Sequence, residues 1–273
     1  MRQTGSELRG VVHTRKRHHN DRLVVESPYL WRARRDEAQH RLICFPHAGG
    51  GANAYASWAR RLPREIELAA VQLPGRQNRI AEDPVTAVDP LVRTLIDALR
   101  SVLNGSFSFF GHSSGSLLAF EVARELQAQG GPCPARLFVS AQSSPDVIWG
   151  GPKLHDLPEA EFRTAILSLG GFDTELIEDD EAVAELLPPV LADFRLWESH
   201  RITRAPLLEI PIVALVGQSD WRAPLATMEG WQAYTTASFA TRVYPGGHFY
   251  LIDEGNDVPG FIEQTLLGIR SQS

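Results

Sequence analysis

Residues 109–115 read Phe-Phe-Gly-His-Ser-Ser-Gly, and this run constrains the fold more than any other part of the chain. It contains the pattern G-x-S-x-G, with Ser113 at its centre. Gly111 and Gly115 lie two residues to either side, where a side chain would collide with backbone in a sharp turn. A serine at such a corner takes a strained conformation that exposes its hydroxyl. The run therefore predicts a strand, a tight turn and a helix, with Ser113 as a candidate nucleophile.

The flanks of this motif agree with the interpretation. Phe107, Phe109 and Phe110 are aromatic residues suited to a buried strand. Apolar residues then recur at helical spacing until Gly130 and Gly131 end the helix. They are Leu117, Leu118, Phe120, Val122, Ala123 and Leu126. An ordinary glycine-serine loop between a strand and a helix is the alternative, and these flanks favour it less.

The composition narrows the class of protein. The chain has 273 residues, 43% of them hydrophobic, which suits one large domain or a domain with an insertion. We expect neither a membrane span nor export, because long apolar runs and an apolar N-terminal signal are both missing. The formal net charge of −6 argues against nucleic-acid binding. Two cysteines indicate a reducing, cytoplasmic location, and Cys44 in its apolar run is interpreted as a core residue.

Short apolar runs alternate with helical patterns along most of the chain. We expect strands at residues 41–45, 68–73, 137–141 and 212–216. Two more are expected, one directly before Ser113 and one that ends at Tyr244. Helices are expected near 54–62, at 90–103, after Ser113, near Met228 and at 261–269. This alternation predicts an α/β fold, with a mostly parallel central sheet and helices on both faces.

The alternation breaks at about residue 145. Residues 156–200 look all-helical, with one helix capped by Asp156 and a longer one over 181–198. Residues 1–25 are rich in basic and poor in apolar residues, so we expect a disordered N-terminal extension. The expected organisation is this extension, a core formed by 26–145 and 205–273, and a helical lid at 146–204.

A serine nucleophile needs a general base, and the base needs an acid that orients it. In α/β-hydrolases, whose nucleophile motif Ser113 matches, the chain order is serine, acid, histidine. His248 follows the last predicted strand in a glycine-rich loop, whereas the other histidines after Ser113 fall in the helical insertion. His248 is therefore the expected base. Asp220, at the end of the preceding strand, is the expected acid, and Asp146, one strand earlier, is the alternative.

The oxyanion hole of such a site needs two backbone N–H donors. One is expected from Ser114, directly after the nucleophile. The other is expected from Ala48, in the glycine-rich run 45–51 that follows an early predicted strand. A phosphate-binding loop is the rival interpretation of this run, but the Lys-Ser/Thr pair of a Walker motif does not follow it.

Four runs occur in order and at compatible spacing: Phe-Pro-His-Ala-Gly-Gly at 45–50, Leu-Pro-Gly-Arg at 73–76, Gly-His-Ser at 111–113 and Gly-Gly-His-Phe at 246–249. Together they resemble the type II thioesterases of polyketide and nonribosomal peptide biosynthesis, over about residues 28–270. The resemblance implies an α/β-hydrolase fold with a flexible helical lid. It also implies hydrolysis of acyl groups from the phosphopantetheine arm of carrier proteins, which clears stalled or misprimed synthases.

By this resemblance Ser113, Asp220 and His248 form the catalytic triad, and Ala48 and Ser114 supply the oxyanion donors. Acyl or peptidyl carrier domains of a synthase are the implied partners, without nucleic acid or membrane, and we expect a monomer. No metal or redox cofactor is needed for this chemistry. A carboxylesterase or lipase would use the same triad, and a transferring or cyclising thioesterase would differ in the group that displaces the acyl-enzyme.

The chain departs from the family pattern near the site. The family commonly has methionine after the nucleophile and alanine two residues further on, where this chain has Ser114 and Ser116. We expect these serines to make the lining smaller and more polar, which leaves the acyl preference open. The family often has an acidic residue where this chain has Gln77, so an ion pair with Arg79 is expected to be lost or replaced.

Apolar residues of the helical insertion are candidates for lining the acyl site. They are Phe162, Leu186, Leu187 and Trp197. The alternative is that they pack the lid onto the core.

Overall fold

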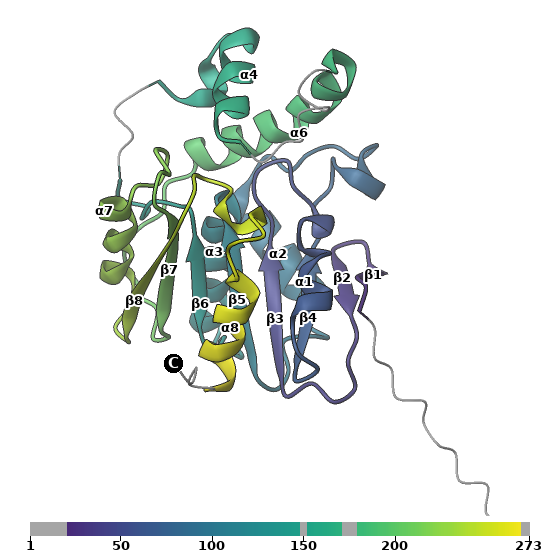
Figure 1. Cartoon of the computed structure of the whole chain (residues 1–273), viewed down its shortest axis with the longest axis vertical. Coiled ribbons are helices and arrows are strands. Elements are labelled where there is room, and N and C mark those ends of the chain that lie inside the picture. The colour runs from purple at the N-terminus through teal and green to yellow at the C-terminus, as the bar shows by residue number, and fades with distance from the viewer. Residues whose placement is uncertain (1–20, 148–151, 171–178, 269–273) are drawn as a thin grey trace, which may run out of the picture.

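The computed structural model describes residues 21–147, 152–170 and 179–268, which contain an eight-stranded sheet (Figure 1). Its strands are β1 (Val24–Ser27), β2 (Leu30–Ala33), β3 (His40–Phe45), β4 (Ile66–Val71), β5 (Phe107–His112), β6 (Leu137–Ser140), β7 (Ile212–Gly217) and β8 (Phe239–Tyr244). The strand order is β1-β2-β4-β3-β5-β6-β7-β8. The β1–β2 and β2–β4 pairs at one edge are antiparallel and the other five pairs are parallel, so the predicted mostly parallel sheet is confirmed.

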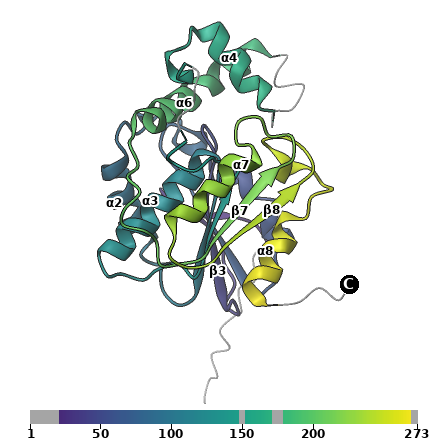
Figure 2. The ribbon, with the colours of Figure 1, turned by 90° about the vertical axis from the view of Figure 1, so that its left-hand side faces the viewer.

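Helices cover both faces of this sheet, as predicted (Figure 2). One face carries α2 (Val88–Leu99), α3 (Ser114–Ala128) and α7 (Leu225–Met228), and the other carries α1 (Trp58–Arg61) and α8 (Val258–Leu267). Short 3-10 helices join these elements: η1 (Ala52–Tyr55), η2 (Gln77–Arg79), η3 (Leu154–Asp156), η4 (Glu229–Tyr234) and η5 (Tyr250–Ile252). Across the described ranges, each helix is too short or too polar to cross a membrane.

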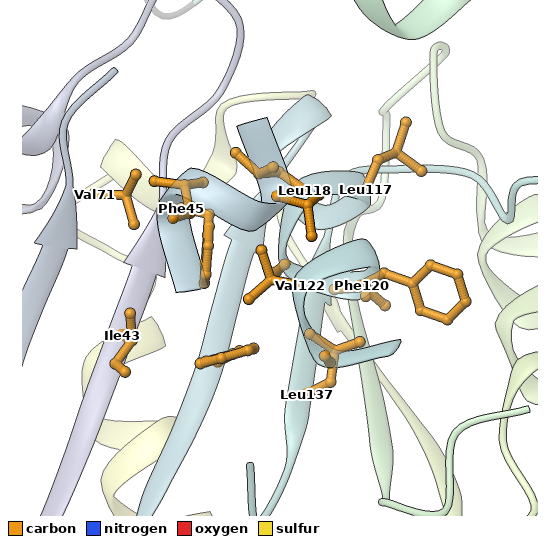
Figure 3. Packing of buried hydrophobic residues seen from close by; sticks show 14 of the residues in the cluster. Ile43, Phe45, Val71, Leu117, Leu118, Phe120, Val122 and Leu137 are labelled. Atoms are coloured by element: carbon orange, nitrogen blue, oxygen red, sulfur yellow. The ribbon is translucent and has the colours of Figure 1, made fainter. Parts of the chain in front are cut away.

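The parallel strands β3 to β7 are buried on both faces and divide the core into two layers, whereas the edge strand β8 is mostly exposed. Because side chains alternate along a strand, Ile43 and Phe45 of β3 point to the α2 and α3 side, while Leu42 and Cys44 join the opposite cluster. Figure 3 shows the first layer, where residues of β3 and β6 meet the inner face of α3. Burial raises the pKa of the Cys44 thiol well above its usual value, which agrees with its interpretation as a core residue.

The lid segment, which we define as residues 152–170 and 179–199, lies over the carboxyl ends of the parallel strands (Figure 1). It contains α4 (Glu159–Ser168) and α6 (Asp180–Ser199), which bury an apolar cluster of their own. The predicted cap at Asp156 is wrong, because Asp156 belongs to η3 and α4 starts after Pro158. Asp179 instead caps α6 and accepts hydrogen bonds from two backbone N–H groups.

The sheet begins at Val24, ahead of the predicted core boundary at residue 26. Val24 and its neighbour Val25 are exposed, so β1 shows no buried apolar face that a sequence pattern could reveal. The strand forms through its pairing with β2, and the Arg32–Glu26 ion pair at 2.9 Å supports that pairing. The rest of the predicted extension, residues 1–20, lies outside the described residues.

Candidate active site

Ser113 lies at the turn between β5 and α3, at the carboxyl edge of the sheet. Its backbone angles, φ 53° and ψ −128°, are unusual for a residue with a side chain, which is typical of a strained turn. A Cβ on Gly111 would lie 2.3 Å from the Gly115 carbonyl oxygen. One on Gly115 would lie 2.2 Å from the Phe45 carbonyl oxygen. The chain makes this turn because neither glycine has a side chain.

Replacing Gly115 with alanine should lower the free energy of unfolding by at least about 2 kcal/mol, because an added methyl group in a close contact must displace the neighbouring backbone. The new methyl group would meet the backbone of Phe45 and Pro46, whose oxygens lie 2.2 and 2.5 Å from the Cβ position. Urea unfolding followed by circular dichroism measures the change. Gly247→Ala is the matched control, since its Cβ position has open space around it. Equal unfolding midpoints for the two variants would contradict the expectation.

The structure brings Ser113, His248 and Asp220 together. His248 Nδ1 lies 2.9 Å from Asp220 Oδ2, and His248 Nε2 lies 3.1 Å from Ser113 Oγ. The Asp220 and His248 side chains are 0% and 2% exposed, so water does not compete for their contact. The other Asp220 oxygen accepts the N–H groups of Arg222 and Ala223. An Nδ1–H donated to this carboxylate leaves Nε2 free to accept the Ser113 proton.

Asp146, the alternative acid, lies elsewhere. After β6 the chain turns toward α7, where the Ser144 N–H donates to the Thr227 carbonyl. Asp146 Oδ1 lies 3.8 Å from the Cβ position of Gly230 on η4. Burial, together with the charge of Asp146, raises the pKa of Tyr234, on the same helix, to about 12. The geometry therefore favours Asp220 as the partner of His248.

The two predicted oxyanion donors come from segments that meet at Ser113. Ser114 begins α3, where the helix dipole favours negative charge. Ala48 lies in the loop after β3 and lines the same cavity as Ser113. In the described part of the chain, the N–H groups of Ala48 and Ser114 donate to no other protein group. Both are therefore available to a negatively charged oxygen.

Two histidines beside the base, the buried His112 and the partly exposed His47, were missed by sequence reasoning. The ring of His112 lies 5.4 Å from that of His248, and the ring of His47 lies 6.0 Å from that of His112. His112 Nδ1 contacts Ser140 Oγ at 2.8 Å, and this oxygen contacts the Tyr250 hydroxyl at 2.6 Å. Burial lowers the pKa of His112 well below its usual value and lowers the pKa of His47 to about 4. Both rings are thus neutral near pH 7. The sequence signal that could have identified them is their position in the family motifs at 45–50 and 111–113.

A cavity of about 580 Å³ opens above Ser113 and His248. The glycine-rich loop after β3 and the loop that carries Gln77 line its sides. The lid segment supplies a mostly apolar roof, formed by Ile166, Leu169, Leu186, Pro189, Val190 and Phe194 together with the charged Glu185. The lining residues Asn53 and Ile80 are exposed, so they mark the mouth of the cavity.

Of the four predicted lid residues, only Leu186 lines this cavity. Phe162 and Leu187 are buried in the lid segment's own cluster, where the Phe162 ring packs edge-on against Phe194 at 5.9 Å. Trp197 packs against the main core of the α3 face. Helical rotation separates Leu187 from Leu186, because neighbouring residues of α6 point about 100° apart. Trp197 lies three turns further along α6, beyond the cavity, and Phe162 lies on α4.

Comparison with known proteins is consistent with this geometry. The family model described as a thioesterase domain matches residues 40–266. The chain belongs to the thioesterase family. Among curated relatives of this thioesterase is the gramicidin S biosynthesis protein GrsT of Aneurinibacillus migulanus. It is 35% identical over 229 residues, which are 84% of this chain and 90% of GrsT.

Two solved structures are also similar to this thioesterase. RedJ, a thioesterase from the prodiginine biosynthetic pathway of Streptomyces coelicolor, is 37% identical with a TM-score of 0.76, covering 85% of this chain and 90% of RedJ. BorB, a type II thioesterase from the borrelidin biosynthetic cluster, is 33% identical with a TM-score of 0.80, covering 89% of this chain and 99% of BorB. These similarities confirm the resemblance to type II thioesterases, the α/β-hydrolase fold and the assignment as a serine hydrolase acting on thioesters.

The departures from the family pattern have structural explanations in this thioesterase. Ser116 does not line the cavity, so the expected polar lining there is wrong. Its fully buried hydroxyl donates to the Gly111 carbonyl at 2.8 Å and accepts the Ser140 N–H at 3.1 Å, which ties the elbow helix to β6. Arg79 does have a replacement partner, because its Nε lies 2.7 Å from Glu82 Oε1.

Proposed function

We propose that this thioesterase hydrolyses acyl groups from the phosphopantetheine arm of carrier proteins, and so clears stalled or misprimed polyketide or peptide synthases. The observation that supports this proposal most is the series of hydrogen-bond contacts from Asp220 through His248 to Ser113, which lies on the floor of a cavity with a mostly apolar roof. The names of GrsT, RedJ and BorB, which refer to the biosynthesis of gramicidin S, prodiginine and borrelidin, support this substrate class.

In the proposed acylation step, the thioester carbonyl lies beside Ser113. His248 Nε2 takes the hydroxyl proton as Ser113 Oγ forms a bond to the carbonyl carbon. The charge that develops on the carbonyl oxygen is stabilised by the N–H groups of Ala48 and Ser114, at roughly 3 kcal/mol per donor. The carbon–sulfur bond then breaks, and His248 returns the proton to the departing pantetheine sulfur. Asp220 stabilises the imidazolium between these transfers.

Deacylation repeats these steps with water as the nucleophile. His248 takes one proton from water while the oxygen attacks the Ser113 ester, and the same two N–H groups stabilise the oxyanion. The ester bond breaks, the acid leaves, and Ser113 regains its proton from His248. The neutral rings of His47 and His112 place no competing positive charge beside the imidazolium.

The shape of the cavity suggests how a carrier-bound substrate lies. The acyl chain packs under the apolar roof of the lid segment, where its transfer from water is favourable. The pantetheine arm enters at the mouth, beside Asn53 and Ile80. We further propose that the enzyme acts in the cytoplasm as a monomer, with the carrier domains of a synthase as partners and no cofactor.

Hydrolysis of an acyl-pantetheine thioester should exceed that of the matched oxygen ester by at least about tenfold in kcat/KM, because the site is proposed to act on a thiol leaving group. Steady-state kinetics on the two substrates, which share one acyl chain, measure the ratio. A tenfold preference for the oxygen ester would favour the carboxylesterase or lipase alternative.

Product analysis separates hydrolysis from acyl transfer. The proposal expects the free acid as the product, even when an amine or alcohol is present. Mass spectrometry of the product mixture would reveal an amide, ester or macrocycle if another nucleophile displaced the acyl-enzyme. Such products would support the transferring or cyclising alternative.

A further inference from the structure

One carboxylate of the lid segment joins three stretches of chain above the sheet. Asp193, on α6, accepts a hydrogen bond from the Gly49 N–H at 2.8 Å. It also pairs with both terminal nitrogens of Arg76, with Oδ1 3.0 Å from Nη2. The Arg76 and Asp193 side chains are 3% and 7% exposed. A bidentate, charge-assisted pair away from water fixes the relative position of the groups that it joins.

The partners of Asp193 are themselves held firmly. Arg76 Nε donates to the Pro74 carbonyl at 3.1 Å, and the Arg76 carbonyl accepts from Gln72 Nε2 at 3.0 Å. The Gln72 side-chain oxygen accepts the Ala52 N–H at 2.8 Å. The glycine-rich loop is therefore fastened at two points. The core holds it at Ala52 through Gln72, and the lid segment holds it at Gly49 through Asp193.

Close packing adds to these polar contacts. A Cβ on Gly49 would lie 2.3 Å from Val190 Cγ2, so α6 rests directly on the loop backbone. Val190 stands one turn before Asp193, on the same side of the helix. Ala48 packs against the apolar cluster of the lid segment. The peptide that carries the Ala48 N–H is thus held between the core and α6.

We propose that Asp193 is a positioning residue for thioester hydrolysis. By holding Gly49 and Arg76 it sets the direction of the neighbouring Ala48 N–H, so the oxyanion hole is complete only while α6 is packed on the loop. The inference rests on the proposed function, because it takes the Ala48 N–H as a donor to the oxyanion. It adds a connection between lid position and the rate of the chemical step.

The test compares Asp193→Ala and Asp193→Asn with the wild type on an acyl-pantetheine thioester. Loss of one oxyanion donor lowers kcat by about 10² to 10³, so Asp193→Ala should lower kcat about 100-fold with KM nearly unchanged. Asp193→Asn should lose less, because the amide oxygen can still accept the Gly49 N–H. A trifluoromethyl ketone analogue, which binds Ser113 as an oxyanion, should lose affinity in parallel with kcat. An analogue with a methylene group in place of the ketone carbonyl cannot form an oxyanion. It should bind to the Asp193 variants as tightly as to the wild type.

Glu67→Gln is the matched control. Glu67 is also a buried carboxylate, 2.8 Å from Arg32 and 2.9 Å from Arg41, but it lies at the start of β4, away from the carboxyl edge of the sheet. Its loss should lower stability and leave kcat and ketone affinity unchanged. The inference is overturned if the Asp193 variants behave like Glu67→Gln or change only KM. Failure of the wild type to hydrolyse the thioester would instead refute the proposed function, and the ketone affinities would still test Asp193.

Discussion

Replacing Ser113 with alanine should lower kcat for a thioester by roughly 10⁴- to 10⁶-fold, with little change in fold or KM. The serine oxygen, 3.1 Å from His248 Nε2, is the atom proposed to form the acyl-enzyme, and alanine has none. Alanine adopts the strained backbone at this position about as readily as serine, so the turn should persist. Residual catalysis would come from the oxyanion donors and the cavity.

Steady-state hydrolysis and labelling by a fluorophosphonate measure this effect. The wild type should gain one phosphonyl group on Ser113, located by mass spectrometry, and the variant should gain none. Ser101→Ala, at an exposed position, is the control and should keep full activity and labelling. Labelling of the Ser113→Ala variant, or activity within tenfold of the wild type, would show that another group is the nucleophile.

Replacing Asp220 with asparagine should lower kcat by roughly 10³- to 10⁴-fold. The carboxylate oxygen 2.9 Å from His248 Nδ1 would become an amide that cannot fix the ring in the required tautomer. The N–H groups of Arg222 and Ala223 could still donate to the amide oxygen, so the loop should keep its shape. The loss should therefore appear in kcat and not in the unfolding midpoint.

Asp146→Asn is the matched control for this substitution, because Asp146 is the carboxylate that the sequence offered as the alternative acid. It lies beside Tyr234 and should change kcat by less than about threefold. Parallel measurement of both variants gives a clear outcome. A large loss in Asp146→Asn together with an active Asp220→Asn would reverse the assignment of the acid.

The lid segment shows where sequence patterns stop being informative. The helix α6 was expected nearly within its observed bounds, because its apolar spacing is a local feature. The sequence did not predict which of its side chains line the cavity, since Leu187 and Trp197 are as apolar as Leu186. Burial against α4 and against the core uses those residues, and only the assembled structure separates the three.

The sequence by itself determined the elbow at Ser113, the parallel α/β sheet and the choice of His248 as the candidate base. These features depend on residues that are neighbours in the chain, where glycine positions and apolar periodicity act directly on the backbone. Only the tertiary structure favours Asp220 over Asp146 as the acid, because either carboxylate follows a strand in the right order. Only the tertiary structure, too, joined Asp193 to Arg76 across 117 positions of the chain. A buried ion pair of this kind leaves no local pattern, since its partners meet only once the lid packs on the core.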